Sequence, residues 1–394
     1  MQPASDPDPR AVHAPGEPLQ GAEGKRNGAA GAHGIEFPWA HGDIAIGPDT
    51  LRDVAVRYKG NGTYYDGQRV GKFSYKVDLN EFVKGQSFGS VSTLNLHSNV
   101  TDVSWMNEAL ALRLYRDAGV PTPRTSYARV HLATGAEPRY LGLYSLVENV
   151  DGPFIRRNFA NTGGALFKPV SMNLFQYLGE DWAKYNQTYD PKDKPNAAQK
   201  KRLIDFTSLV SRTSDEEFAA RIGTFIDLDA FARYMAVMVF LSDVDGLLGP
   251  GQNFYLYLDP KTEKFTFIPW DQDHSFGQLP EAFTESQRAQ ISIHQPWTGD
   301  NRFMERMFAV KAFKGLYLAK LTEFNNTLFV PARFEKQVEE IAPAIRPAVA
   351  EESEEKLELF DQAVAGKIKR FVGARTSSIA AQLAGKSKGE IPVR

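Results

Sequence analysis

The chain contains no cysteine, no long apolar run and almost no net charge. Without cysteine, disulfide bonds, thiolate metal sites and a cysteine nucleophile are excluded. No apolar run approaches the roughly 18–20 residues that a membrane-spanning helix needs, so we expect no membrane span. Lys and Arg number 46 against 48 Asp and Glu, which gives a formal net charge of −2. This balance gives no support for nucleic acid or an anionic membrane as a partner.

Large apolar side chains are also scarce at the N-terminus. Residues 1–34 are rich in Pro, Gly and Ala, and such a segment buries too little surface to offset the entropy of ordering it. We predict a disordered arm there and a solvated basic tail at 386–394. The rest of the 394 residues, with 12% aromatics in the chain, suffices for a large core in one large domain or two smaller ones.

Hydrophobic periodicity predicts two lobes of different character. From residue 35 to 150, apolar and polar residues alternate in strand-like runs, with one amphipathic helix from about 101 to 118. From 151 to 385 the helical period dominates, and strands at 253–258 and 265–268 form a hairpin. The other predicted strands are 53–59, 72–79, 91–96, 127–132, 140–148 and 163–169. A loop is predicted at 178–197. The predicted helices of the second lobe are 198–212, 214–222, 227–241, 301–324, 331–345 and 351–383. The fold class is therefore α+β, with a strand-rich N-terminal lobe and a larger helical C-terminal lobe.

Two carboxylates directly follow the second strand of the hairpin. Asp271 and Asp273 stand two residues apart, and on an extended segment residues i and i+2 point to the same side. They can therefore hold one hard cation such as Mg²⁺ between them. The alternative is a turn in which both side chains cap backbone N–H groups. A single neighbouring histidine, His274, makes a poor transition-metal site, and we expect it to orient a carboxylate.

Polar residues upstream of the hairpin favour the metal site over the capping turn. Asp243 and Asp245 follow a hydrophobic helix, Asn253 opens the next strand, and Asp271 ends the hairpin ahead of Phe276-Gly277. Protein kinases use the same order: a catalytic-loop Asp, a metal-binding Asn and the Asp of Asp-Phe-Gly. Phosphoryl transfer needs divalent cations on phosphate oxygens and a carboxylate that accepts the hydroxyl proton. This set can supply both, although its spacing is looser than in ordinary kinases and His-Arg-Asp is absent.

Several motifs spread along the chain are shared with one known family. They are Arg57 to Thr63, Lys72 to Leu79, Leu94 to Leu96, Asp102 to Ser104, Gly119 to Arg124, Tyr140 to Glu148, Gly164 to Lys168, Gly251 to Tyr257 and Pro269 to Gly277. The most specific part combines Gly-Leu-Tyr…Val-Glu at 140–148 with Pro-Trp-Asp-x-Asp-x-x-Phe-Gly at 269–277. Over most of its length the chain resembles the CotH kinase family, the spore-coat-protein-H type of atypical protein kinase.

The resemblance implies a two-lobed, protein-kinase-like fold that binds ATP with Mg²⁺, or Mn²⁺ in its place, and phosphorylates Ser or Thr of a protein. The family's Asn-x-Asp element falls on Asp243-Val244-Asp245, where this chain has Asp in place of the more usual Asn. Asp245 is the favoured base and Asp243 the alternative. Asn253 is expected to be a metal ligand, and Asp271 and Asp273 the main Mg²⁺ carboxylates. We expect a monomer, and the resemblance favours an exported or cell-surface location over the cytoplasm.

Two lysines are candidates for the strand lysine of a kinase N-terminal lobe. Lys76 is expected to bind an ATP phosphate and to pair with Glu108 on the following helix, and Lys72, on the same strand face, is the second candidate. The alternative is that both lysines are simply exposed, as most lysines are, and that Glu108 only completes a capping box.

Other candidates for nucleotide binding come from glycine-rich turns and the end of a strand. Gly60-Asn61-Gly62 is expected to pass over the phosphates, because backbone N–H groups can approach oxygen closely there, although a hairpin turn uses the same residues. Glu148 ends a strand where a kinase hinge would run, and backbone groups of a hinge usually meet adenine. Lys168 follows a glycine pair and is a further candidate to reach the nucleotide.

Two other functions remain open from the sequence. The same acidic cluster would serve a Mg²⁺-dependent phosphatase or nucleotidyl transferase, and a kinase-shaped coat or surface scaffold would need no catalysis. The complete Asp–Asn–Asp set argues against the scaffold, since a scaffold has no need to keep every metal ligand.

Overall fold

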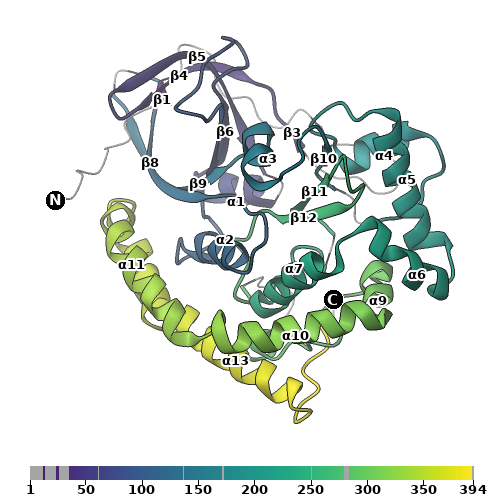
Figure 1. The fold of residues 1–394 in the computed structure, drawn as a ribbon. Coiled ribbons are helices and arrows are strands. Elements are labelled where there is room, and N and C mark those ends of the chain that lie inside the picture. Colours follow the sequence, from purple (N-terminus) through teal and green to yellow (C-terminus); the bar gives the residue numbers. More distant parts are fainter. Residues whose placement is uncertain are drawn as a thin grey trace.

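The computed structural model describes residues 12–13, 24–25, 35–60, 62–135, 137–170, 173–249, 251–278 and 284–392. Most of the predicted arm at 1–34 lies outside the described residues, and so does Asn61. Figure 1 shows a strand-rich N-terminal lobe joined to a larger helical C-terminal lobe, as predicted. Among the described residues, no helix combines the length and apolar character that crossing a bilayer requires.

The N-terminal lobe is a closed barrel with the strand order β1-β4-β5-β6-β7-β9-β8. Its strands are β1 (Val12–His13), β4 (Ala40–Ile46), β5 (Asp49–Lys59), β6 (Ser74–Asp78), β7 (Thr93–His97), β8 (Thr125–Ala133) and β9 (Arg139–Glu148); β2 (Gly24–Lys25) and β3 (Ile35–Glu36) form a separate pair. One hydrophobic cluster, which includes Val54, Val56, Val77, Leu94 and Tyr144, fills the interior of the barrel. Burial is not strictly alternate, since every residue of β7 is buried.

Three helices accompany the barrel: α1 (Gly62–Val70), α2 (Asn107–Asp117) and α3 (Gly152–Asn158). The predicted helix start near residue 101 moves to Asn107, because Asp102 closes a turn before it. The Asp102 carboxylate accepts the backbone N–H groups of Ser104 and Asn107, each at 2.8 Å. Helix α2 is then buried over most of its length and packs against the long buried helix of the second lobe.

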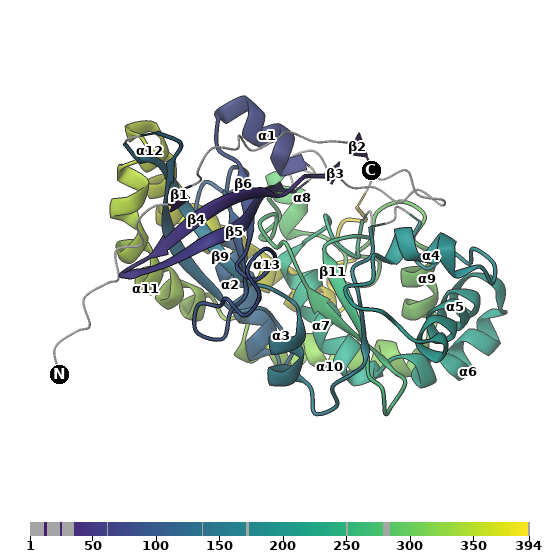
Figure 2. The ribbon, with the colours of Figure 1, turned by 90° about the horizontal axis from the view of Figure 1, so that it is seen from above.

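The C-terminal lobe is built around α7 (Leu228–Leu241), whose side chains are almost all buried. Beside it lies a sheet with the order β10 (Ala165–Phe167), β11 (Phe254–Leu258) and β12 (Phe265–Pro269), which contains the predicted hairpin. The surrounding helices are α4 (Trp182–Tyr189), α5 (Ala197–Arg212), α6 (Asp215–Phe225), α8 (Glu285–Ala289), α9 (Arg302–Ala309), α10 (Lys311–Thr327), α11 (Pro331–Ala350), α12 (Glu354–Gln362) and α13 (Ile368–Leu383). Figure 2 separates the barrel on one side from α4, α5 and α6 on the other.

The structure contains elements that the sequence did not predict, among them β4, α1, α3 and, inside the predicted disordered arm, the short strand β1, which pairs with β4 and β8. Three predicted elements also differ. The predicted loop at 178–197 contains α4, which Asp181 caps by accepting the N–H of Ala183. The predicted helix at 301–324 is divided at Val310 into α9 and α10. A π-helical turn, Ala363–Lys367, interrupts the predicted helix at 351–383.

The C-terminal helices return to the barrel. In Figure 1, α11 runs along the side of the barrel formed by β8 and β9. The Tyr140 hydroxyl of β9 donates to the carbonyl oxygen of Ala348 at 2.9 Å, and Arg129 of β8 pairs with Glu351 at 2.7 Å. These helices therefore add a second connection between the lobes to the one that the chain makes near residue 150, beside the packing of α2 against α7.

Candidate functional site

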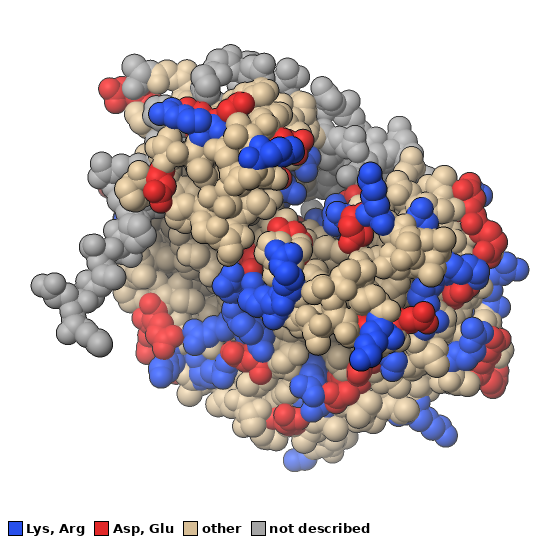
Figure 3. Space-filling model, turned by 45° about the horizontal axis from the view of Figure 1, so that its top comes forward, with Lys and Arg blue, Asp and Glu red and all other residues tan. Residues whose placement is uncertain are grey.

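A cavity of about 820 Å³ lies between the two lobes, within the usual size range of small-molecule sites. Its lining comes from β5 and the glycine-rich segment after it, from β6 and β7, from residues 149–152, from β10 and residues 190–193, and from the loops after α7 and β12. Figure 3 shows that basic and acidic side chains are mixed over this face, with both signs beside the hollow between the lobes.

Asp271 and Asp273 both line this cavity. Asp271 has a φ of +57°, so the backbone is not an extended strand there, although both side chains still reach the same space. Asp273 is held in place by Thr101 Oγ1, which donates to its Oδ2 at 2.5 Å, and by Asn107 Nδ2, which donates to its carbonyl oxygen at 2.8 Å. Among the described residues, no backbone N–H donates to either carboxylate, so the pair does not form the capping turn.

The loop after α7 supplies the next carboxylates. The helix ends at Ser242, whose φ is +50°, and the chain turns so that Asp245 lines the cavity while Asp243 is buried beneath it. Asp243 Oδ1 accepts the N–H of Asp245 at 3.1 Å. Asn253 Nδ2 donates to Asp245 Oδ2 at 2.8 Å and to its carbonyl oxygen at 3.0 Å. The structure thus brings Asp245 and Asn253 to the same cavity as Asp271.

Burial dominates the electrostatics of these carboxyl groups. It raises the pKa of Asp245 to about 7 and those of Asp243 and Asp273 to about 6, while the imidazole of His274 opposes the rise in all three. For His274 the balance is reversed: burial favours the neutral ring, but the surrounding carboxylates outweigh it and raise its pKa. His274 therefore supplies positive charge to the acidic cluster.

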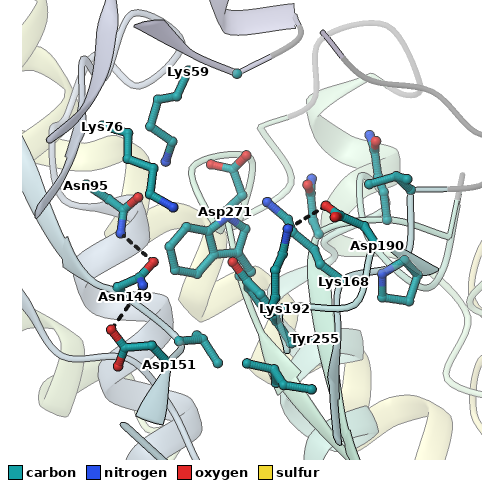
Figure 4. A pocket seen from close by; sticks show the side chains of 18 of the residues that line it. Lys59, Lys76, Asn95, Asn149, Asp151, Lys168, Asp190, Lys192, Tyr255 and Asp271 are labelled. Carbon is teal, nitrogen blue, oxygen red and sulfur yellow. Dashed lines mark hydrogen bonds and ion pairs between the residues drawn. The ribbon is translucent and has the colours of Figure 1, made fainter. Parts of the chain in front are cut away.

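Four lysines line the cavity together with these carboxylates: Lys59 and Lys76 from the barrel, Lys168 from the segment after β10, and Lys192, which pairs with Asp190. Figure 4 shows them on both sides of Asp271. Burial lowers the pKa of Lys76 to about 8 and that of Lys168 to about 7, and it lowers the pKa of Lys59 as well. The Nζ atoms of Lys59 and Lys168 lie 5.1 and 5.2 Å from the centre of the Trp270 ring.

Glu108 of α2 pairs with a histidine and not with the predicted Lys76. His97 Nδ1 lies 2.7 Å from Glu108 Oε2 and 3.7 Å from Asp271 Oδ1, and His97 Nε2 bonds to Lys59 Nζ. Among the described ion pairs, none joins Lys76 to Glu108. Burial raises the pKa of Asp271, but its electrostatic interactions with the His97 ring and with the ammonium groups of Lys59 and Lys168 outweigh burial, so that the pKa is lowered. Glu108 makes no helix-capping hydrogen bond of its own.

The predicted glycine-rich loop is in the cavity lining. Gly60, with a φ of +97°, and Gly62 both contribute to it, while Asn61 is outside the described residues. Helix α1 begins at Gly62, so the segment leads from a strand into a helix N-terminus and does not form a hairpin turn.

Four predicted residues are not in the cavity lining: Asp243 and Glu108, described above, and Lys72 and Glu148. Lys72 precedes β6, so the alternation that pairs it with Lys76 does not apply, and its Nζ binds the carbonyl oxygen of Leu143 at 3.0 Å and Glu352 at 2.9 Å. Glu148 is also outside the lining. Burial raises its pKa, but hydrogen bonds from Arg157 and Arg124 outweigh this and lower it. Residues 149–152, which follow it, do line the cavity.

The lining also contains residues that sequence reasoning missed. Lys59 stands directly before the glycine-rich segment, a position that could have marked it. Asn95 Nδ2 donates to Asn149 Oδ1 at 3.3 Å, and Asn149 Nδ2 donates to Asp151 Oδ2 at 3.1 Å, a chain of side chains that Figure 4 shows along one wall. No motif in the sequence marks this chain, because its members meet only when β7 and the lobe junction come together.

A strand-rich lobe and a helical lobe that enclose lysines and carboxylates define a two-lobed protein of the protein-kinase-like class. More particularly, the chain belongs to the CotH kinase family, described as CotH kinase protein, whose profile matches residues 56–379. The family resemblance predicted from the motifs is thereby confirmed.

Two individual proteins are similar to the chain. It is 25% identical over 306 residues to the inner spore coat protein H of Bacillus subtilis (strain 168), covering 76% of this chain and 80% of that protein. A solved toxin–antitoxin complex of HipA, HipB and operator DNA from Shewanella oneidensis MR-1 contains a chain with 13% identity and a TM-score of 0.34. That match covers 79% of this chain and 64% of the other, and its TM-score is too low to support an argument.

Proposed function

We propose that the protein transfers the γ-phosphate of ATP to Ser or Thr of a protein, with Mg²⁺ or Mn²⁺. The observation that carries the proposal is the convergence of lysines with an Asp–Asn–Asp–Asp set on one cavity between the lobes. The residues concerned are Lys59, Lys76, Lys168, Asp245, Asn253, Asp271 and Asp273. Membership of the CotH kinase family supports the same reaction class.

The cationic part of the cavity suits a triphosphate. Lys59, Lys76 and Lys168 can place ammonium groups on phosphate oxygens. Gly60 and Gly62 bring backbone close to the same space, and α1 begins there, so that unpaired N–H groups of its first turn can bind an anion.

The acidic part suits a hard divalent cation. Asp271 and Asp273 offer carboxylate oxygens, which Mg²⁺ and Mn²⁺ prefer. The amide nitrogen of Asn253 is committed to Asp245, which leaves its Oδ1 as the atom for a cation. A bound divalent ion would neutralise charge on the phosphate oxygens.

Asp245 is the base that the geometry supports. Its carboxylate lines the cavity, whereas Asp243 is buried beneath and supports the loop through the N–H of Asp245. Asn253 orients the Asp245 carboxylate at 2.8 Å. A pKa raised to about 7 by burial suits a group that accepts a hydroxyl proton near neutral pH.

Incubation with ATP labelled in either the α or the γ position tests the proposal. We expect label from the γ position only, in the presence of Mg²⁺ or Mn²⁺, with phosphoserine or phosphothreonine found by mass spectrometry on the protein itself or on an added acceptor. Transfer of the α label would identify a nucleotidyl transferase, and absence of both ATP binding and transfer would leave a scaffold.

Variants of the two key carboxylates sharpen that test. Asp245→Asn is expected to lower transfer by about 100-fold or more while ATP still binds, because a base contributes about 10²–10⁴ in rate. Asp271→Asn is expected to weaken the metal dependence itself. Asp205→Asn, an exposed residue of α5 in an ion pair with Lys201, is the control for loss of an unrelated Asp.

A further inference from the structure

We propose that His97 is a positioning residue that links Lys59 of β5 to Glu108 of α2, so that Lys59, and not Lys76, is the phosphate lysine tied to the helix. The inference rests on the proposed phosphotransfer and adds to it a three-membered Lys–His–Glu connection in place of a direct lysine–glutamate pair.

The polarity of the three groups fits this connection. An ammonium can only donate hydrogen bonds and a carboxylate can only accept them, whereas a neutral imidazole has one donor and one acceptor. With Lys59 donating to Nε2, the proton of the ring is on Nδ1 and is donated to Glu108 Oε2 at 2.7 Å. Each hydrogen bond therefore fixes the other, and the tautomer of His97 is determined by its two neighbours.

The surroundings hold the histidine in place. Its side chain is 8% exposed and that of Glu108 is 1% exposed, and the ring meets Trp270 edge-on with 5.6 Å between the ring centres. Glu108 belongs to α2, which packs against α7 of the C-terminal lobe. The connection therefore runs from a barrel strand, through His97, to a helix anchored in the other lobe.

His97 itself does not line the main cavity, whereas Lys59 and Asp271 do. It lies in a small adjoining space of about 20 Å³ with both of them. His97 therefore acts on the reaction through cavity residues and not directly. Of these, Lys59 is hydrogen-bonded to His97, whereas Asp271 Oδ1 lies 3.7 Å from it, so we propose Lys59 as the route. Lys76 lies on β6, opposite Arg57 and Asn95 in the sheet register, and has no comparable connection to α2 among the described residues.

A metal held by His97, Glu108 and Asp271 is the competing reading, because one ligand atom from each lies within 4.8 Å of the others. The distances favour the hydrogen bonds. Two ligands of one ion, each at about 2.0–2.2 Å in a tetrahedral site, have their atoms more than about 3 Å apart, whereas His97 Nδ1 and Glu108 Oε2 are at 2.7 Å. An ammonium bonded to the other ring nitrogen also disfavours a cation there.

A double-mutant cycle on the full-length protein tests the proposal. His97→Leu is expected to lower kcat by about 10–100-fold, as misplacement of a reacting partner by about 1 Å does, whereas His97→Gln, whose amide offers an acceptor to Lys59 and a donor to Glu108, retains more of the rate. In a Lys59→Ala background His97→Leu should have little further effect, because its influence passes through the missing ammonium. In a Lys76→Ala background the loss should remain full.

The outcomes separate the readings. Equal, multiplicative losses in both lysine backgrounds would mean that His97 only supports the fold, and would overturn the proposal. His131→Gln, on β8 away from the cavity, controls for replacing a half-buried histidine of the barrel. If the wild-type protein binds ATP but transfers nothing, the phosphotransfer proposal fails. The same double-mutant cycle is then measured through the dissociation constant for ATP in place of kcat.

A second measurement needs no variant that might misfold. Nitrogen NMR of the 15N-histidine-labelled wild-type protein above pH 8 should show His97 with its proton on Nδ1, whatever the activity. A proton on Nε2 would overturn the proposal. So would a shift of the His97 nitrogens on titration with Zn²⁺ in the absence of nucleotide, because that shift is expected of a metal ligand.

Discussion

Asp245 shares its buried site with Asp243, Asp273 and the imidazole of His274. Carboxylates this close in a poorly solvated place cannot all ionise freely, so the folded protein holds protons that the same residues would lose in water. Burial causes this preference for protonated carboxyl groups. The carboxylates in turn raise the pKa of His274, so that one compensating positive charge stays among them. A divalent cation would also compensate the negative charge of the carboxylates, so protonation of the site and metal binding are linked.

We therefore expect the stability of the metal-free protein to fall as the pH rises from about 4 to 7. An unfolded Asp has a pKa of about 3.9, whereas that of Asp245 in the fold is about 7, so the native state holds more protons in this window. By linkage the unfolding free energy then decreases with pH. The raised pKa of His274 acts in the same direction, since its contribution is complete below its unfolded value and is lost as the pH rises.

Chemical denaturation in EDTA at several pH values between about 4.5 and 7 checks this expectation. In Asp245→Asn the slope of unfolding free energy against pH should be shallower by up to about 1.4 kcal/mol per pH unit, the contribution of one proton. Asp205→Asn serves as the exposed control. A slope in the Asp245 variant as steep as in the wild type would show that this carboxyl is not the group holding the proton.

The acidic residues of the site could be predicted because each follows a recognisable local pattern. Asp271, Asp273 and Asn253 adjoin a hairpin, and a carboxylate after a hydrophobic helix completes the order used in kinases. Lys59 and His97 could not be found in this way. They are 38 residues apart and meet only through the register of β5, β6 and β7, which the alternation of side chains does not determine.

At the scale of an element, the turn from β5 into α1 depends on one glycine. Gly60 has a φ of +97°, and a Cβ there would collide with Thr63 Oγ1. Gly62 has no positive φ, and a Cβ there would meet no other atom within 4 Å. The two glycines of one motif therefore have different requirements: the first needs its backbone freedom, and the second only begins a helix.

Gly60→Ala is expected to lower the unfolding free energy by about 1–3 kcal/mol, the cost of a strained backbone position, and to weaken ATP binding by displacing the start of α1. Gly62→Ala should change stability by no more than about 0.5 kcal/mol. Denaturant titration and calorimetry with ATP measure the two effects. Similar losses in both variants would mean that the bend at Gly60 has no special role.

The elements that sequence reasoning missed share one cause. Helix α4 contains several Tyr and polar residues, which indicate a loop by composition, yet Tyr185 and Tyr189 stand one turn apart and are buried in the core of the C-terminal lobe. Helix α1 begins at the second glycine of a Gly-x-Gly that is typical of a hairpin. In both, tertiary packing decides between conformations that local preference leaves nearly equal, whereas α7, apolar over its length, was predicted from its sequence alone.

At the scale of the whole molecule, Glu352 fastens the C-terminal helices to the barrel. Its carboxylate, in the turn between α11 and α12, accepts the N–H of Leu143 at 2.7 Å and hydrogen bonds from Lys72 and Lys356. The carboxylate lies against Gly142 of β9, where a Cβ would come within 2.5 Å of it. Lys72, predicted as a nucleotide lysine, is absent from the cavity lining and instead holds the C-terminal helices to the barrel.

Removing this contact tests whether the two lobes form one cooperative unit. The side chains of Lys72 and Glu352 are 5% and 3% exposed, so Glu352→Ala leaves a buried ammonium without its partner and is expected to cost about 3–5 kcal/mol of unfolding free energy. Glu351→Ala breaks the neighbouring but exposed pair with Arg129 and should cost about 1 kcal/mol at most. A double variant, Lys72→Met with Glu352→Leu, should recover most of the loss, since it removes both charges together.

The form of the unfolding curve decides what the contact does. If the helices only cover the barrel, Glu352→Ala lowers the midpoint of a single transition. If they hold the barrel in place against the C-terminal lobe, the barrel unfolds first, and fluorescence of Trp105, beside Lys72, changes at lower denaturant than the helical signal. The second result is expected, because the glycine-rich segment and Lys59 reach the cavity only while the barrel is held against α2 and α7, and ATP should then raise the midpoint of the first transition alone.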